Sequence, residues 1–421
     1  MPTSRTARLT GPALTLALGA SLLVNTPSLA DGDEPHPHHE HSTASSQVAL
    51  DWQRTSIRTV YTENASTVPA GALYLGFASL AMNEAARRSE RAHSASSEAA
   101  VAVAAHDVLA TYFPASAANL DADLSASLGD IADGNAKARG MAKGARAADR
   151  LIATRADDGR DDTSIVYAKP PAIGVWQPAP GGSMLVPWVG FVDPLVVRHI
   201  ATAPGPEDLS SAEWAADYDE TRRLGAAVGS ERTAEQTATA LFFNSNAATM
   251  LTEGVLRWLD DHMMSLRRTT QLFAAMHAAE ADSIIAAWRQ KFDVGFWRPV
   301  QAVALADLDG NSATTPQPGW TPLLPTPPYS EYVSGHAATT SPAAEVIRHM
   351  LGDDTTLTLH SYNTNSDRTY ASISAIEADA LNSRIWGGLH FRAAMDDGYA
   401  MGHSTAREVL RRLADRCWSE D

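Results

Sequence analysis

Apolar positions recur at helical spacing along most of this chain. Trp52, Ile57 and Val60 begin the pattern, and Ala- and Leu-rich runs continue it at 70–87, 94–112, 116–128, 136–156, 211–229, 233–243, 248–263, 266–292, from His336 to about 351, and at 391–414. Such runs favour helix by propensity and periodicity. The Pro- and Gly-rich segments 169–194 and 314–328 predict irregular chain. Because strand-like alternation is nearly absent, we expect a mainly α fold of packed helix bundles.

The N-terminal segment has the pattern of an export signal. Arg5 and Arg8 precede an apolar run at 14–24 that is too short to span a bilayer, and Ser28-Leu29-Ala30 resembles a small-x-small cleavage site. We therefore expect residues 1–30 to be a signal peptide and the mature protein to be secreted or otherwise extracytoplasmic.

Residues 31–47 form a polar, histidine-rich stretch that contains His36, His38, His39 and His41. We interpret it as a disordered tether, and a weak metal-binding tail is the alternative. Residues 48–421 are then expected to form a single large α-helical domain, with a catalytic core at about 240–416.

Composition narrows the class of partner. The 421 residues are 44% hydrophobic, which is ample for a large core, and their net charge is -16. A strongly acidic chain argues against nucleic acid as a partner. The longest apolar stretch after the N-terminus, 71–82, is too short to span a membrane, so we expect the protein not to be membrane-embedded. Cys417 is the only cysteine, so no internal disulfide can form.

Three short motifs in the C-terminal third carry candidate chemistry. Lys291 and Arg298 lie at the end of a predicted helix and in the turn after it, where Arg offers a planar fork for two oxygens and Lys a point charge. Taken alone, this pair is also typical of a solvated helix end.

The second motif, Ser334-Gly335-His336, opens a predicted helix. Backbone N–H groups at a helix start bind anions, glycine permits a close backbone approach, and histidine can move a proton. In the third motif, Arg384 would be a second fork, and His390 follows the flexible pair Gly387-Gly388. Each histidine taken singly is also compatible with a hydrogen-bonded core residue. Together, the motifs predict a pocket for a tetrahedral oxyanion.

In this order, the three motifs resemble the superfamily of type 2 phosphatidic acid phosphatases and vanadium-dependent haloperoxidases. The likeness covers about 280–402 closely. The long helical N-terminal half and the segment 174–178 resemble the soluble haloperoxidase branch, in contrast to the membrane-embedded lipid phosphatases.

The resemblance implies a role for each motif residue. The residues that would bind the equatorial oxygens of vanadate or phosphate are Lys291, Arg298, Ser334, Gly335 and Arg384. His390 would be the axial metal ligand in a haloperoxidase or the nucleophile in a phosphatase. His336 would be the acid–base group on the opposite side, and Lys291 would also polarise bound peroxide.

The resemblance also implies a pocket wall made of Trp288 and Tyr329, the latter at the position thought to tune halide preference in the family. Val333 stands where the family usually has proline. This departure changes the stiffness of the turn and removes no functional side chain.

The sequence leaves several functions open. The favoured one is a secreted haloperoxidase that takes hydrogen peroxide and halide at a His-bound vanadate. An acid phosphatase that hydrolyses a small phosphate ester through a phosphohistidine, without a cofactor, would use the same residues. A non-catalytic oxyanion-binding protein would need neither His336 nor His390, and a metal-scavenging histidine tail on an inert body is a further alternative. The oligomeric state, the acidic partner of His390, the halide and the organic acceptor or ester are not determined.

Overall fold

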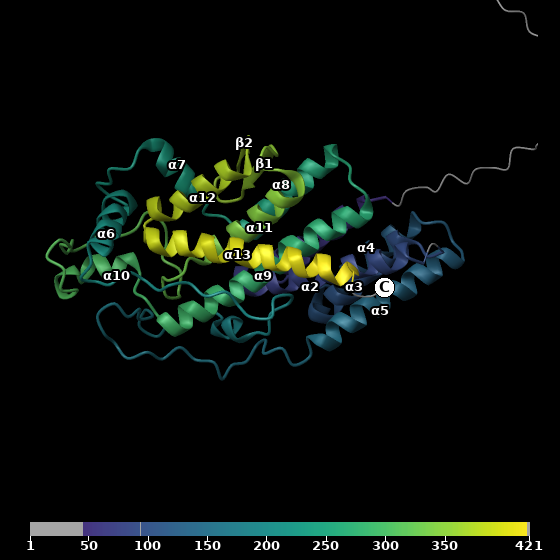
Figure 1. Ribbon diagram of the computed structural model, residues 1–421, viewed down its shortest axis with the longest axis horizontal. Helices are drawn as coiled ribbons and strands as arrows, with labels where there is room; N and C mark the ends of the chain where they lie inside the picture. The colour runs from purple at the N-terminus through teal and green to yellow at the C-terminus, as the bar shows by residue number, and fades with distance from the viewer. Residues whose placement is uncertain (1–44, 93, 419–421) are drawn as a thin grey trace, which may run out of the picture. The chain divides into compact units, whose positions relative to one another are not determined.

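The structure is a computed structural model, and it describes residues 45–92 and 94–418. The predicted signal peptide and nearly all of the predicted tether lie outside the described residues. Within them the chain is mainly helical, which confirms the predicted fold class (Figure 1).

The first helices form an N-terminal group. They are α1 (Gln47–Ile57), the π-helical η1 (Arg58–Glu63), α2 (Val68–Glu90), α3 (Ser97–Tyr112), the 3-10 turn η2 (Pro114–Ser116), α4 (Ala117–Gly129) and α5 (Asn135–Thr154). Gly140 and Gly144 of α5 lie against the backbone carbonyls of Ser96 and Ala100, where any β-carbon would clash. Glycine therefore lets α5 approach α3 closely.

A long and largely irregular segment follows α5, as the Pro and Gly content predicts, and contains the 3-10 turn η3 (Pro187–Phe191). The remaining elements are α6 (Ala212–Gly225), α7 (Ala234–Phe242), α8 (Ala247–Asp261), α9 (Leu266–Val294), α10 (Pro299–Ala304), η4 (Ala306–Leu308), α11 (Gly335–Leu351), strands β1 (Leu357–Ser361) and β2 (Ser366–Tyr370), α12 (Ile373–Trp386) and α13 (Arg392–Trp418).

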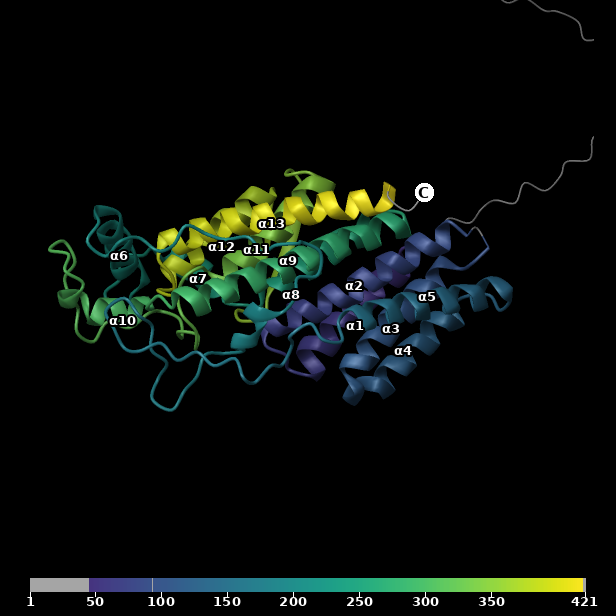
Figure 2. The same ribbon diagram turned by 60° about the horizontal axis from the view of Figure 1, so that its bottom comes forward.

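Helix α9 is the central element. It packs against α2 of the N-terminal group and against α11 and α13 of the C-terminal group, so that it lies between the two (Figure 2). Nearly all its residues from Leu272 to Trp288 are buried, including the polar His277, Glu280 and Asp282. Because its middle is packed on both sides, α9 fixes the residues at its C-terminal end relative to the core.

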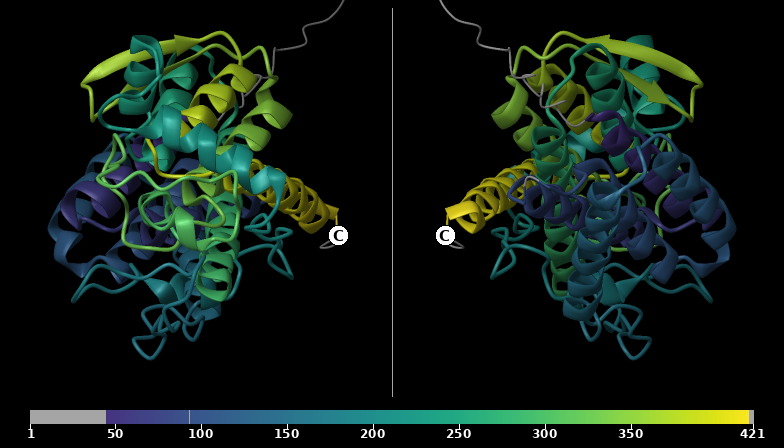
Figure 3. Two further views of the ribbon diagram at one scale, coloured as in Figure 1. Left: turned by 90° about the vertical axis from the view of Figure 1, so that its left-hand side faces the viewer. Right: turned by 90° about the vertical axis from the view of Figure 1, so that its right-hand side faces the viewer.

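Three features depart from the predicted elements. The strands β1 and β2 form an antiparallel hairpin that pairs Leu357 with Tyr370 and lies beside α8 (Figure 3). The sequence patterns also did not predict helices α10 and α12. The helix expected at 211–229 ends earlier, at Gly225, because Ala226 adopts an extended backbone conformation. Five-residue strands are too short for alternation to stand out from a helical pattern.

None of the helices among the described residues is long and apolar enough to cross a membrane.

Candidate active site

The predicted site residues come from four helix ends that the fold brings together. Lys291 is in the last turn of α9, Arg298 is the N-cap residue of α10, Ser334 is the N-cap residue of α11, and Arg384 is in the last turn of α12. His390 lies in the short link between α12 and α13. Helix ends leave backbone N–H or C=O groups without intrahelical partners, so their convergence places many polar groups at one point.

Lys291 is completely buried, which excludes the solvated helix end as its setting. Its Nζ donates to the carbonyl oxygens of Ser330 at 2.9 Å and Glu331 at 2.8 Å, and it lies 4.9 Å from the ring centroid of Tyr329. Burial, reinforced by the charge of Arg298, lowers the pKa of Lys291 well below its usual value. A negative charge bound beside Lys291 would raise its pKa again, because it would oppose both the burial and the charge of Arg298.

Each of the two arginines presents a donor that has no acceptor in the part of the chain that the structure describes. Arg298 is fully buried, and its Nε and Nη1 donate to the carbonyls of Tyr329 at 2.8 Å and Leu389 at 2.9 Å. Among the described residues, its Nη2 has no acceptor, and neither has the Nε of Arg384, a side chain that is 7% exposed. Burial lowers the pKa of Arg384 to about 10, so its guanidinium stays charged at neutral pH. Burial also lowers the pKa of Arg298, against the opposing charge of Glu331.

Such orphaned, buried and charged donors are costly unless an anion accepts from them. A tetrahedral oxyanion therefore fits the residues present.

Ser334-Gly335-His336 forms the start of α11, as predicted. The Ser334 hydroxyl oxygen accepts from the N–H of Ala337 at 3.3 Å. A β-carbon on Gly335 would come within 2.8 Å of the Trp288 ring, so glycine lets the indole lie directly against the turn. The helix N-terminus thus meets the site with open backbone and a partial positive charge.

His336 has a defined tautomer. Its Nε2 lies 3.1 Å from the carbonyl oxygen of Phe243, which can only accept, so Nε2 carries the proton. Its Nδ1 then keeps the lone pair and accepts from the Thr340 hydroxyl at 3.1 Å. Burial, with the charge of Arg384, lowers the pKa of His336 to about 3, and the ring is neutral at pH 7.

His390 is held by a carboxylate that the motifs did not reveal. Its Nδ1 lies 2.8 Å from Oε1 of Glu331, which also accepts from the N–H of Phe391 at 3.0 Å. With Nδ1 as the donor, Nε2 keeps its lone pair and faces Arg298 Nη1 at 3.2 Å. Burial raises the pKa of Glu331 to about 7 against the opposing charges of Lys291 and Arg298. Burial, followed by the charge of Arg298, lowers the pKa of His390.

One signal in the sequence could have pointed to Glu331. It is the only Asp, Glu, Lys or Arg between residues 310 and 335. Asp396 and Asp397, the acids closest to His390 in sequence, do not contact it, and Asp397 accepts from the Tyr332 hydroxyl at 2.6 Å.

A cavity of about 270 Å³ opens beside these residues. Both predicted wall residues line it, and their rings are 5.0 Å apart. The indole Nε1 of Trp288 donates to the carbonyl of Leu185 at 3.1 Å, which fixes the ring. Gly335, His336 and Arg384 also line the cavity, and so does the segment Asn244, Ser245, Asn246 and Ala247, which was not predicted.

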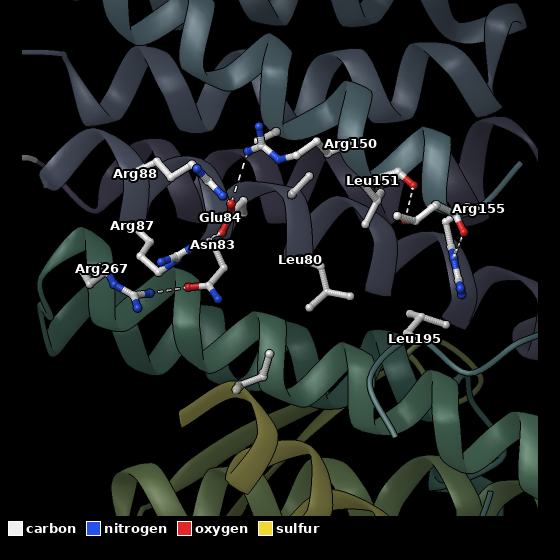
Figure 4. Close-up of a pocket in the computed structure, with 14 residues that line it drawn as sticks. Leu80, Asn83, Glu84, Arg87, Arg88, Arg150, Leu151, Arg155, Leu195 and Arg267 are labelled. Carbon is white, nitrogen blue, oxygen red and sulfur yellow. Dashed lines mark hydrogen bonds and ion pairs between the residues drawn. The ribbon is translucent and has the colours of Figure 1, made fainter. Parts of the chain in front are cut away.

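A larger groove of about 460 Å³ lies elsewhere, between α2, α5, α9 and α13. Arg87, Arg88 and Arg150 surround Glu84 there, and the groove shares no lining residue with the cavity above (Figure 4). Because one carboxylate pairs with three guanidiniums, these charges compensate one another in part. The groove contains none of the predicted site residues.

Comparison with known proteins agrees with this architecture. The family described as "VCPO second helical-bundle domain" matches residues 271–419. None of the curated proteins matches the chain.

Two solved structures illustrate the likeness. The first bacterial vanadium-dependent iodoperoxidase is 18% identical with a TM-score of 0.72, and the match covers 89% of this chain and 98% of that one. A bacterial vanadium-dependent chloroperoxidase in its apo form is 17% identical with a TM-score of 0.67, covering 84% and 95%. The chain therefore has the helical-bundle fold of the vanadium-dependent haloperoxidase superfamily, as its motifs predicted.

Proposed function

We propose that this protein is a secreted vanadium-dependent haloperoxidase that oxidises a halide with hydrogen peroxide. The observation that carries the proposal is a pair of buried guanidinium nitrogens, Arg298 Nη2 and Arg384 Nε, for which the described residues provide no acceptor. The lone pair of His390 Nε2, 3.2 Å from Arg298 Nη1, adds to it. Such donors call for an oxyanion, and an imidazole lone pair suits a metal centre within it. The likeness to solved bacterial vanadium haloperoxidases supports vanadate as that group.

The residues that would hold vanadate are Lys291, Arg298, Arg384, Ser334 and Gly335 around its oxygens and His390 at its metal. Bound vanadate would supply a Lewis-acid centre that activates peroxide without a change in oxidation state. The three cations would balance its negative charge in a buried setting, where each contact is stronger than in water.

Glu331 has a supporting role in this proposal. By accepting the Nδ1 proton of His390, it selects the tautomer in which Nε2 can bind a metal, and it fixes the ring plane. The bond from Phe391 N–H to the same oxygen holds the carboxylate in place.

Halide oxidation by peroxide consumes a proton, and in this proposal His336 would carry it. The Phe243 carbonyl holds Nε2–H, so Nδ1, which accepts from the Thr340 hydroxyl, is the ring atom that would take and return a proton. A bound negative oxyanion would raise the pKa of His336 from its low value toward the working range.

The experiment compares purified protein with and without orthovanadate. Peroxide-dependent oxidation of iodide, bromide and chloride is measured alongside hydrolysis of a chromogenic phosphate ester, with His390→Ala as the inactive control. We expect halide oxidation that appears only with vanadate and is blocked by phosphate. Ester hydrolysis that vanadate inhibits would instead assign a phosphatase with His390 as its nucleophile.

Secretion is tested separately. The full chain is produced in an exporting bacterial host, and mass spectrometry of the exported protein is expected to show an N-terminus after Ala30. Retention of the whole chain in the cytoplasm would refute this part of the proposal.

A further inference from the structure

Helix α6 lies against the link from α12 to α13 that contains His390. It packs beside the end of α12 and the start of α13 (Figure 1). A β-carbon on Gly225, the last residue of α6, would come within 2.5 Å of the Cα atom of Gly388 and 3.1 Å of the carbonyl oxygen of Ile385. Because glycine stands there, the backbone of α6 is in direct contact with the backbone of the link.

Two hydrogen bonds from α6 hold the main chain of this link. The hydroxyl of Thr221, a fully buried residue, donates to the carbonyl oxygen of His390 at 3.2 Å. One turn earlier, Oδ2 of Asp217 accepts from the N–H of Ala393 at 2.7 Å. Residues four apart lie on the same face of a helix, so one face of α6 supplies both partners. The two bonds bracket the link from residue 390 to residue 393.

The link needs a restraint from outside. Gly387 and Gly388 precede it, and Gly388 adopts the left-handed region with φ of 73°. Glycine restricts the backbone less than any other residue, so this side of His390 does not fix where its Cα atom lies. Glu331 fixes the plane of the ring through Nδ1, and the Thr221 bond fixes the backbone from which the ring extends. Nε2 is placed only when both are set.

The first turn of α6 also contacts the other half of the oxyanion site. The ring of Trp214 stacks on Trp297 at a centroid distance of 6.0 Å and meets the ring of Phe391 edge-on at 4.8 Å. Trp297 directly precedes Arg298, and Phe391 directly follows His390. One rigid helix therefore touches both the turn that carries Arg298 and the link that carries His390.

We propose that α6 is the positioning helix of His390 and that Thr221 is its positioning residue. By holding the His390 carbonyl, Thr221 sets where the lone pair of Nε2 lies relative to an oxyanion bound by the arginines. The inference rests on the proposed function, because a metal within that oxyanion is what the lone pair would bind. Helix α6 precedes residues 271–419, so the family model does not cover it.

Three substitutions separate positioning from packing. Thr221→Val removes the hydroxyl and keeps nearly the same volume, whereas Thr221→Ser keeps the hydroxyl. Thr252→Val is the matched control. Thr252 is also a fully buried helical residue, and its hydroxyl pairs with a different helix, at Nε2 of His277, 2.9 Å away. Neither threonine lines the cavity.

Calorimetry measures the affinity of each protein for orthovanadate and for inorganic phosphate. The cations can hold either anion, whereas only vanadate offers a metal to the imidazole nitrogen. We expect Thr221→Val to raise the vanadate Kd about tenfold and to leave the phosphate Kd unchanged. Thr221→Ser and Thr252→Val should keep both wild-type affinities.

Nuclear magnetic resonance of the oxyanion-free protein, made with isotope-labelled histidine, gives a second readout. The Nδ1 proton of His390 is bonded to Glu331. We expect this proton to exchange with solvent faster in Thr221→Val, because the ring is no longer held against the carboxylate. The exchange rate should stay at the wild-type value in Thr221→Ser and Thr252→Val.

Wild-type vanadate affinity in Thr221→Val would overturn the positioning role. An equal loss of vanadate and phosphate affinity would also overturn it, because α6 would then only support the fold of the whole site. If Thr221→Val does not fold, Thr221→Ala takes its place, and a wild-type ratio of the two affinities in that variant overturns the inference.

A wild type that binds vanadate no more tightly than phosphate would refute the proposed function. The positioning role is then decided by the Nδ1 proton of His390 alone. Faster exchange in Thr221→Val would support the role without any metal, and an unchanged exchange rate would overturn it.

Discussion

Replacement of Glu331 by glutamine tests whether this buried carboxylate positions His390. One Glu331 oxygen accepts two hydrogen bonds, from His390 Nδ1 at 2.8 Å and Phe391 N at 3.0 Å. Glutamine keeps an acceptor of the same shape and loses the charge. The bond from Phe391 holds the carboxylate whether or not vanadate is bound, so only the bond to His390 acts on the metal ligand. A hydrogen bond to a charged group is worth about 1 kcal/mol more than a neutral one, which corresponds to about fivefold in vanadate affinity.

The assay is calorimetric titration of vanadate at about pH 8, where Glu331, with a pKa of about 7, is mostly ionised. Glu377→Gln is the matched control, because Glu377 is also a buried glutamate, accepts from a histidine, His403, at 2.6 Å, and lies outside the site. We expect Glu331→Gln to lose affinity and turnover, and Glu377→Gln to lose only thermal stability. Wild-type vanadate affinity in Glu331→Gln would refute the positioning role.

Three further changes have distinct expected results. Arg384→Ala and Arg298→Ala should each weaken vanadate binding by about 1.5–3 kcal/mol in calorimetry. Only Arg298→Ala should also lower Tm, because of the two arginines it is Arg298 whose side chain donates to carbonyls among the described residues; an equal Tm loss in both variants would contradict this. Gly190→Ala would place a β-carbon 2.5 Å from the backbone nitrogen of Arg289. Denaturant titration should therefore show that the free energy of unfolding falls by about 1–3 kcal/mol. Wild-type stability would mean that the loop can move away from α9. Because the pKa of Glu331 is raised, its contribution to the stability of the oxyanion-free protein is fully present below about pH 4.5 and falls by about 3 kcal/mol as the pH rises through about 7. Glu331→Gln should flatten this part of the curve of unfolding free energy against pH. An unchanged curve would refute the assignment.

The sequence alone was sufficient for features that depend on neighbouring residues. Helical periodicity predicted most of the helices, because one buried face repeats along each of them. Ser334-Gly335-His336 was recognisable at a helix start, since capping and anion binding there need only adjacent residues. The fold brings the motif residues together at converging helix ends, and their roles in binding and catalysis stay predictions.

Tertiary structure decided everything that depends on which distant groups meet. Whether Lys291 lies at a solvated helix end or is buried follows from what packs on α9, and no local pattern carries that information. Glu331 and His390 are 59 residues apart, and the fold alone made them partners. The first residues of α8 line the cavity for the same reason: hydrogen bonds and charges act over a few ångströms in space, whereas periodicity and capping act over a few residues of chain.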